Sequence, residues 1–459
     1  MIVFLSPPPA RSGAGVFPYF MTSDVHHRRV ESQAVRLPTS ADIETAADNI
    51  PREIVNETVL QVHLRLSETY GAEIVIANEG AQPLRSYKGR GAANAFARRV
   101  DLLRDRGAVC ASAGNHSQGF SASCNHFQVQ GKVFMPKTTP EQKTEATKER
   151  GNGYVGIELV GDTFDEADVA ARTFERESGV IYIHPFDHPD IVAGQGTLAL
   201  EILKQMNARR KKIDLLLAPI GGGGLISGLG IYFHDHSPDT KVIGVESELA
   251  AAMHASVKAG RRVTLDKKKM SKFADGAAVC TPGEIGFAVV SRLGIPILTV
   301  PEGRLCGTML DLINKDGILA EPAGALAIDA LAEVQSEIKG KTVVCILSGS
   351  NFDAARYAEV VDRAVRYRRK KRYFTVELPN RPDSLADLLS ILKGRGVNIS
   401  NFHYDEAAPG GIATAFMGLE ANNPKILSDS IRALRTSGIE FQEETTNPLL
   451  HEMLIPTCI

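Results

Sequence analysis

A repeated unit of apolar strand, turn and helix is the feature of this sequence that most limits its fold. Apolar runs typical of buried strands lie at residues 73–76, 108–111, 132–136, 215–219, 242–246 and 343–347. Several of these runs lead through a turn into a stretch whose apolar residues recur at helical spacing. Strands that alternate with helices pair in parallel, and the helices then cover both faces of the sheet. The sequence therefore predicts an α/β fold with a mostly parallel sheet.

Length and composition exclude several classes of protein. The chain has 459 residues, enough for two or three domains that each bury a core. Its 52 basic and 54 acidic residues give a formal net charge of −2, so we expect no nucleic-acid surface. No apolar run approaches the roughly 18 residues of a membrane span, so we expect no membrane partner. The six cysteines lack zinc-like spacing, which predicts reduced thiols, no metal site and a cytoplasmic location.

Changes of composition divide the chain into four parts. Residues 1–40 are expected to form a flexible N-terminal extension, within which Met21 is an alternative start. Residues 41–365 carry the strand and helix units and are expected to form the main domain. Residues 366–372 are rich in Arg and Lys, a run more typical of a solvated helix end or a basic linker than of a nucleic-acid patch. Residues 373–457 are expected to form a separate small domain.

The small domain shows the order β-α-β-β-α followed by a short last strand. Strand patterns lie at residues 373–379, 398–404, 413–419 and 439–443, and helical patterns follow Pro382 and Pro424. The apolar faces of the two helices are expected to hold Leu385, Leu388, Leu389 and Leu392, and Leu427, Ile431 and Leu434. This order predicts a split βαβ sandwich of the α+β class.

Lys88 stands between an aromatic residue, Tyr87, and a glycine, Gly89, at the start of a helix rich in small residues. A lysine in such a place can be desolvated, and its neutral amine is then able to attack a carbonyl and hold it as a Schiff base. The run Lys-Gly-Arg-Gly is equally typical of a solvated basic turn. This segment alone does not distinguish the two interpretations.

Four consecutive glycines, Gly221–Gly224, separate a fully apolar strand from a helix that starts near Leu225. Successive N–H groups of such a turn can point into one concavity, and the helix N-terminus adds positive potential, so the turn suits a phosphate. The Gly-x-Gly-x-x-Gly spacing of dinucleotide sites and the Gly-Lys-Ser/Thr ending of nucleotide triphosphate sites are absent. The alternative is a flexible turn without a ligand.

Two further turns follow predicted strands. The first, from Ser112 to His116, offers amides and a hydroxyl that suit a carboxylate or a ring oxygen. Within it, Asn115 is the stronger candidate, since a lone histidine such as His116 is more often a packing residue than a base. The second turn holds Ser348 at the carboxyl end of a strand, where open α/β sheets bind ligands. A serine there is more often only a turn former.

Together, an amine nucleophile, a phosphate turn, an anion loop and a hydroxyl at a strand end suit a phosphorylated aldehyde, and pyridoxal phosphate is the cofactor they fit. Seven segments then resemble, in order, the threonine dehydratase family, within the tryptophan synthase β-like, fold-type II group of pyridoxal phosphate enzymes. They are residues 86–92, 112–119, 194–197, 219–225, 273–276, 321–325 and 348–351. The resemblance implies a catalytic domain of two open-sheet α/β subdomains, followed by one ACT-like regulatory domain.

The resemblance also implies a role for each matching residue. Lys88 would hold the cofactor as a Schiff base and later take the Cα proton of the substrate, with Tyr87 beside the ring. Backbone amides would bind the cofactor phosphate at Gly221, Gly222, Gly223, Gly224 and Leu225. Asn115 would bond the hydroxyl oxygen of the ring.

Three positions bear on the substrate and on the type of reaction. Ser112, Gly114 and Asn115 would receive the substrate carboxylate. Ser348 would face the pyridine nitrogen, and a hydroxyl cannot hold that nitrogen protonated as an aspartate does. Prompt loss of a β-hydroxyl is then favoured over transamination or racemisation. Ala113, which has no hydroxyl to donate a proton from the opposite face, also disfavours a racemase.

The family resemblance implies conversion of L-threonine to 2-oxobutanoate and ammonia, the first step of isoleucine biosynthesis. It further implies a homotetramer whose small domain binds an amino-acid effector such as isoleucine. Two alternatives stay open: a serine or 3-hydroxyaspartate dehydratase or racemase on the same scaffold, and a catalytically weak amino-acid-sensing protein. The last alternative draws on a departure from the family before the lysine loop. Residues 77–81 keep only Glu79 of the usual element, and Thr58-Val59-Leu60 stands where the family has Thr-Pro-Leu.

Overall fold

The computed structural model describes residues 36–405 and 411–447. The expected N-terminal extension therefore lies outside the described residues as far as residue 35, and Met21 and Cys458 lie outside them as well. Within the described ranges, no helix combines the length and the apolar character that a membrane crossing requires. Cys110, Cys124, Cys306 and Cys345 are buried free thiols, as expected, whereas Cys280 is partly exposed.

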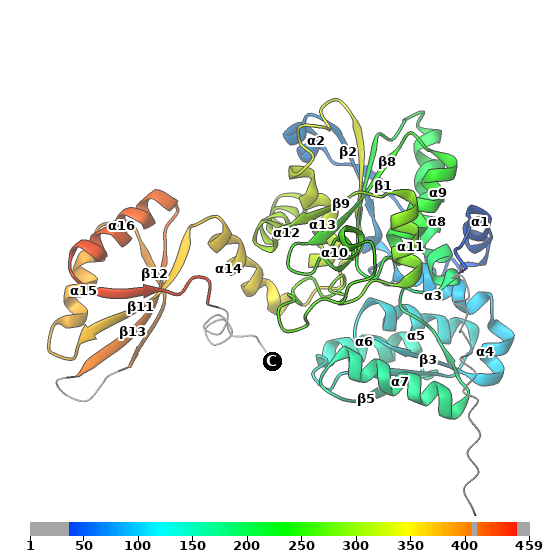
Figure 1. Cartoon of the computed structure of the whole chain (residues 1–459), viewed down its shortest axis with the longest axis horizontal. Coiled ribbons are helices and arrows are strands. Elements are labelled where there is room, and N and C mark those ends of the chain that lie inside the picture. Colours follow the sequence, from blue (N-terminus) through cyan, green and yellow to red (C-terminus); the bar gives the residue numbers. More distant parts are fainter. Residues whose placement is uncertain (1–35, 406–410, 448–459) are drawn as a thin grey trace, which may run out of the picture. The chain divides into compact units, whose positions relative to one another are not determined.

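The larger of two α/β subdomains is built on a six-stranded sheet (Figure 1). In spatial order its strands are β1 (Leu60–Val62), β2 (Glu73–Asn78), β10 (Thr342–Leu347), β7 (Leu215–Pro219), β8 (Lys241–Ser247) and β9 (Ile297–Val300). Only the edge strand β1 is antiparallel; the other pairs are parallel, as the strand and helix alternation predicts. Leu60 begins β1, and the helix that follows this strand begins at Leu64.

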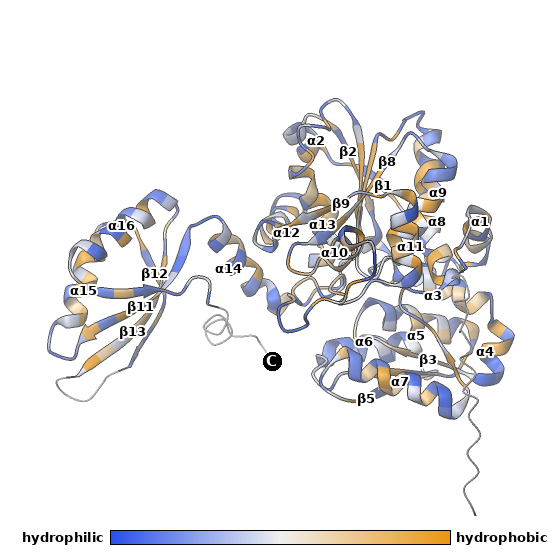
Figure 2. Ribbon diagram, in the orientation of Figure 1, coloured by the Kyte–Doolittle hydropathy of each residue, from blue (hydrophilic) through white to orange (hydrophobic). Residues whose placement is uncertain are grey.

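Helices cover both faces of this sheet, and alternate residues of β2 enter the two hydrophobic cores on either side of it. Ile74 and Ile76 enter one core, and Val75 and Ala77 enter the other. The first core is closed by α2 (Leu64–Tyr70), α12 (Glu302–Asp316), α13 (Pro322–Asp329) and α14 (Tyr357–Tyr367). The second is closed by α1 (Ser40–Asn49), α8 (Pro189–Ala208), α9 (Gly224–His236) and α11 (Glu284–Leu293). In Figure 2 the strands of this sheet are rich in hydrophobic residues, as burial on both faces requires.

The smaller subdomain is built on a four-stranded parallel sheet. In spatial order its strands are β5 (Val155–Leu159), β4 (Gly131–Met135), β3 (Ala108–Ala111) and β6 (Ile181–Tyr182). One face packs against α3 (Lys88–Ala97), α4 (Val100–Arg106) and α5 (Asn115–Phe127), and the other packs against α7 (Phe164–Ser178). Helix α6 (Glu141–Gly151) lies beside α5. The expected pair of open-sheet subdomains is thus confirmed.

The C-terminal domain is an antiparallel sheet with two helices on one face. Its strands lie in the order β12 (Asn398–Asp405), β13 (Ile412–Glu420), β11 (Lys371–Pro379) and β14 (Glu440–Glu443), and its helices are α15 (Ser384–Leu392) and α16 (Pro424–Thr436). The split βαβ prediction is confirmed, and Leu388, Leu427 and Leu434 are buried as expected. Leu389 was expected on the buried face but is 41% exposed, because the core takes only the Leu388 and Leu392 side of α15.

The basic segment 366–372 includes a helix end, as one of the two expectations had it, and is not a linker along its whole length. Arg366 and Tyr367 form the last turn of α14, and β11 already begins at Lys371. Asp362 of α14 explains this, because its carboxylate pairs with Arg366 at 2.7 Å and with Lys371 at 3.0 Å. The like charges are therefore partly neutralised by an acidic residue one helical turn upstream.

Candidate active site

The loop after β10 pairs with the segment that leads into α3, and this pairing places Ser348 beside the Lys88 loop. The Tyr87 amide donates to the Ser348 carbonyl at 3.1 Å, and the Ser350 amide donates to the Arg85 carbonyl at 2.8 Å. An antiparallel bridge joins Ser86 to Gly349 between them. Segments that are far apart in the sequence thus form one wall of a site at the carboxyl end of the parallel strands, where such sheets bind ligands.

Lys88 is the first residue of α3, and its amine has few partners. Nζ donates to the backbone carbonyl of Pro185 at 3.0 Å and lies 5.4 Å from the centre of the Tyr87 ring. Burial lowers the pKa of the Lys88 amine to about 8, although the nearby charge of Glu321 partly opposes this shift. A substantial fraction of the amine is therefore neutral near physiological pH and able to act as a nucleophile.

The glycine turn between β7 and α9 tolerates no side chain at its centre. Gly223 has φ +100°, and a Cβ on Gly222 would lie only 2.2 Å from the nearest carbon of the Phe186 ring. No side chain caps the N-terminus of α9, which starts at Gly224, so the turn offers backbone amides and the positive end of a helix dipole. This arrangement fits a phosphate. Because Pro185 contacts Lys88 and Phe186 contacts the turn, one dipeptide joins the amine to the phosphate cradle.

The turn before α5 holds the other predicted ligands. Ser112 Oγ accepts from the Gly114 amide at 3.2 Å, and a Cβ on Gly114 would meet nothing within 4 Å, so the loop is open on that side. Asn115 begins α5, and its Nδ2 donates to Glu321 at 2.8 Å. His116 is buried against the Ile183 carbonyl, and burial together with the charge of Lys88 lowers the pKa of His116 to about 3. Its interpretation as a packing residue is confirmed.

Ser348 is buried, and its hydroxyl donates to the Ala323 carbonyl over 3.4 Å. This long contact leaves the hydroxyl free to turn toward another partner. Ala323 lies at the start of α13, whose first residue, Pro322, follows the buried carboxyl group of Glu321. Sequence reasoning placed Glu321 in one of the segments that resemble the family, residues 321–325, but assigned it no role at the site.

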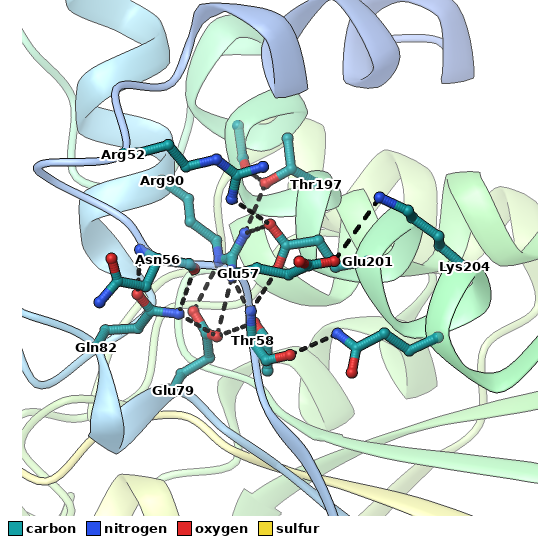
Figure 3. A network of polar contacts seen from close by, with 12 residues as sticks. Arg52, Asn56, Glu57, Thr58, Glu79, Gln82, Arg90, Thr197, Glu201 and Lys204 are labelled. Atoms are coloured by element: carbon teal, nitrogen blue, oxygen red, sulfur yellow. Dashed lines mark hydrogen bonds and ion pairs between the residues drawn. The ribbon is translucent and has the colours of Figure 1, made fainter. Parts of the chain in front are cut away.

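Behind Lys88, a buried network of charges holds the first turn of α3 (Figure 3). The guanidinium of Arg90 donates to Glu79 at 2.7 Å, to Glu201 at 2.9 Å and to the Thr197 hydroxyl at 3.0 Å, and it also donates to Thr58. Burial opposes the charge of Arg90, but the carboxylates of Glu79 and Glu201 raise its pKa well above the usual range. The Arg90 guanidinium thereby links α3 to α8 and to the turn after β2.

This network explains the departure from the family before the lysine loop. Thr58 and Glu79, which are retained, are the residues whose side chains bond Arg90 and each other. The altered positions make other contacts. Ala77 is a buried strand residue, and the carbonyl of Gly80 accepts a hydrogen bond from the Ser350 hydroxyl at 2.9 Å. The substitutions therefore leave the contacts of Arg90 in place, which argues against decay of the site.

Comparison with known families and proteins agrees with this geometry. The family described as pyridoxal-phosphate dependent enzyme matches residues 52–349. The family described as C-terminal regulatory domain of threonine dehydratase matches residues 362–454. The two α/β subdomains and the C-terminal domain are thus each covered by a known domain family.

Curated relatives cover nearly the whole chain. The chain is 40% identical to the biosynthetic L-threonine dehydratase of Halalkalibacterium halodurans over 409 residues, which are 89% of this chain and 97% of the relative. It is 41% identical to the corresponding protein of Bacillus subtilis over 405 residues, 88% of this chain and 94% of that one.

Solved structures match the catalytic part. The processed threonine deaminase isoform 2 of Solanum lycopersicum is similar with a TM-score of 0.66 and 34% identity, covering 72% of this chain and 91% of that chain. Maize serine racemase shares the fold, with a TM-score of 0.65 at 23% identity over 72% of this chain and 99% of that chain. The chain belongs to the pyridoxal-phosphate dependent enzymes and, within them, to the family of biosynthetic L-threonine dehydratases.

Proposed function

We propose that this protein is a threonine ammonia-lyase that converts L-threonine to 2-oxobutanoate and ammonia, in the first step of isoleucine biosynthesis. The observation that carries the proposal is the lysine amine of Lys88, bonded to the Pro185 carbonyl, next to a glycine turn that packs on Phe186 and opens an uncapped helix N-terminus. The names of the relatives support threonine as the substrate. We further propose a cytoplasmic homotetramer, with a catalytic domain at residues 41–365 and a regulatory domain at residues 373–457.

Each predicted ligand has a place in this proposal. The amides of Gly221–Gly224 and Leu225 hold the phosphate, and the amide side chain of Asn115 bonds the ring hydroxyl oxygen. Tyr87 lies beside the ring, and burial raises the pKa of its phenol, so it stays neutral. The open loop at Ser112 and Gly114, together with Asn115, receives the substrate carboxylate.

Bound pyridoxal phosphate supplies an aldehyde that forms a Schiff base with an amine and a ring that withdraws electrons from the substrate Cα. The neutral amine of Lys88 is the base that takes the Cα proton, because its lowered pKa leaves it able to accept one near neutral pH. Ser348 presents a hydroxyl rather than a carboxylate toward the pyridine nitrogen, which favours loss of the β-hydroxyl over other outcomes. Ala113 offers no proton on the opposite side.

The proposed effector site is an open cavity of about 490 Å³ in the C-terminal domain. It lies at the end of β11 and the start of α15, and Arg381, Ser384, Asp387 and Glu440 are among its lining residues. The hydroxyl of Ser384 is buried without a partner among the described residues, and the N-terminus of α15 has no side-chain cap. The Ser384 hydroxyl and Arg381, whose guanidinium also pairs with Asp387 at 3.2 Å, suit a carboxylate, and Glu440 suits an ammonium group, so the cavity fits an α-amino acid.

The decisive test of the activity is incubation of the holoenzyme with threonine, serine and 3-hydroxyaspartate, followed by assay of the oxo acids. We expect fastest formation of 2-oxobutanoate from threonine. Preferential turnover of serine or 3-hydroxyaspartate would overturn the proposed substrate, and absence of bound cofactor would overturn the activity itself.

The effector site is tested by calorimetric titration with isoleucine. Ser384→Ala and Arg381→Gln should each weaken binding by about tenfold, since each removes a hydrogen bond to a charged group. Turnover of threonine without isoleucine should stay unchanged. Equal affinity for isoleucine in all three proteins would exclude this cavity.

A further inference from the structure

The side chain of Asn115 is held at both of its polar atoms. Its Nδ2 donates to Glu321 Oε1 at 2.8 Å, and its Oδ1 accepts from Asn351 Nδ2 at 2.7 Å. Asn351 Nδ2 also donates to the backbone carbonyl of Leu84 at 2.9 Å. These contacts form a continuous chain from the segment before Lys88, through Asn351 and Asn115, to Glu321.

The Leu84 carbonyl determines the orientation of the whole chain. A carbonyl oxygen can only accept a hydrogen bond, so the atom of Asn351 that faces it must be Nδ2. The same Nδ2 then meets Asn115, whose facing atom must be Oδ1, and the other amide atom, Nδ2, must face Glu321. One N–H of Asn115 is used by Glu321. The second N–H has no partner among the described residues.

We propose that Glu321 and Asn351 are positioning residues that hold the Asn115 amide with this second N–H available to the ring oxygen of the cofactor. The inference deepens the proposed function and rests on it. Without the clamp, rotation of the amide by half a turn would present Oδ1 to the ring oxygen. Two acceptors would then face each other, and the hydrogen bond to the cofactor would be lost.

The carboxyl group of Glu321 is closely packed by the residues around it. A Cβ on Gly349 would lie 2.6 Å from Glu321 Oε1, and one on Gly276 would lie 3.2 Å from it, so the carboxyl is packed between two residues without side chains. Burial and the charge of Asp275 raise the pKa of Glu321 to about 8, while the hydrogen bond from Asn115 opposes the shift. A carboxyl group keeps an acceptor oxygen whether or not it is protonated, so the clamp works in both states.

The test is a double-mutant cycle on the dissociation constant of pyridoxal phosphate, measured by absorbance titration of the apoenzyme. Asn115→Ala and Glu321→Ala should each weaken binding by about tenfold, the size of one hydrogen bond to a polar ring substituent. The double variant should lose no more than about twofold beyond either single variant, because both changes remove the same bond. Additive losses would show that Glu321 acts independently of Asn115 and would overturn the proposal.

Two conservative variants separate positioning from other roles. Glu321→Gln keeps an acceptor and removes the charge, so it should bind the cofactor within about threefold of the wild type. Asn351→Asp is isosteric but places acceptors against Leu84 and Asn115, so it should weaken binding by about tenfold. A Gln variant as impaired as the Ala variant would mean that charge, and not amide orientation, matters, and wild-type affinity in Asn351→Asp would exclude the clamp.

These outcomes stay distinct from failure of the proposed function. A wild-type apoenzyme that does not bind pyridoxal phosphate refutes the function itself. Normal binding of the cofactor by the wild type and by Asn115→Ala leaves the function standing and refutes the clamp. Far-UV circular dichroism of each apoenzyme identifies any variant that does not fold, and for such a variant the Gln and Asp substitutions decide the question.

Discussion

Lys88 and Arg90 are two cationic residues two positions apart in the first turn of α3, yet the fold treats their charges in opposite ways. Arg90 donates from Nε, Nη1 and Nη2 to two carboxylates and two hydroxyls, and its pKa is raised. Lys88 has one hydrogen bond to a backbone carbonyl, and its pKa is lowered to about 8. The same helix therefore carries one cation that is fully paired and one amine that readily loses its proton.

The difference shows how a buried charge becomes either a structural or a chemical group. Burial disfavours the charged form of both side chains, and only nearby opposite charges reverse that penalty. Glu79 and Glu201 reverse it for Arg90, which anchors the helix. Lys88 has no carboxylate in salt-bridge contact among the described residues, so it keeps the penalty and gains nucleophilicity.

The largest expected effect comes from removing the chemical member of the pair. Lys88→Ala should lower threonine turnover by at least about 10³-fold, because the variant has neither the Schiff-base amine nor the base for the Cα proton. Far-UV circular dichroism should stay unchanged, since the Lys88 amine makes few contacts. An oxo-acid assay and the visible absorbance of the purified protein check both points. Retained turnover would mean that another residue acts as the base.

Removing the structural member should affect stability instead. Arg90→Met removes the cation that pairs with buried Glu79 and leaves Glu201 with only the distant, exposed Arg52, which should lower the free energy of unfolding by about 3–5 kcal/mol. Urea denaturation of the apoenzyme measures this loss. The matched control is Arg52→Met, because Arg52 is exposed and lies 3.9 Å from Glu201, so the control should change stability by less than about 0.5 kcal/mol. Equal stability of the two variants would contradict the anchoring role of Arg90.

A substitution in the glycine turn Gly221–Gly224 tests whether the site beside Lys88 is as tightly constrained as the Arg90 network. Gly222→Ala would place a Cβ 2.2 Å from a carbon of the Phe186 ring, so the turn or the ring must move, at a cost of about 1–3 kcal/mol. Affinity for pyridoxal phosphate should fall by a corresponding factor in an absorbance titration.

Gly156→Ala is the control for this substitution. Gly156 lies in β5, and its Cβ would meet nothing within 4 Å. The control should keep wild-type affinity and stability. If Gly222→Ala behaved as Gly156→Ala does, close packing of the turn against Phe186 would not be required for cofactor binding.

The smallest effect is a pH dependence that separates Lys88 from an ordinary lysine. Since only the neutral amine attacks the aldehyde, the rate of cofactor capture by apoenzyme should rise about tenfold between pH 7 and pH 9 and level off above the pKa of about 8. Stopped-flow absorbance measures this rate, and the reaction of N-acetyl-lysine methylamide over the same range corrects for ionisation of the cofactor. A rate that still rises steeply at pH 10 would mean that burial does not lower the pKa of Lys88.

Local patterns were sufficient for most of the fold and for the candidate residues. The strand and helix alternation predicted the parallel sheets, and the residues around Lys88, Gly221–Gly224 and Ser348 were recognised from short segments. Residues 366–372 contain the predicted helix end, but β11 begins within them at Lys371, and Arg366 and Lys371 pair with Asp362, a residue outside the run. The prediction that Leu389 is buried was wrong because helical spacing alone does not show how wide the buried face of the helix is.

Sequence by itself determined the candidate residues of the site, because a strand, a glycine turn and a lysine at a helix start are each encoded by neighbouring residues. Tertiary structure decided what those residues are able to do. Arg90 is neutralised by carboxylates from two other segments, and Lys88 is left with the carbonyl of Pro185. Glu321 bonds Asn115 although the two residues are 206 positions apart in the chain. Electrostatic partners are chosen by distance in space, and no local pattern of residues records that distance.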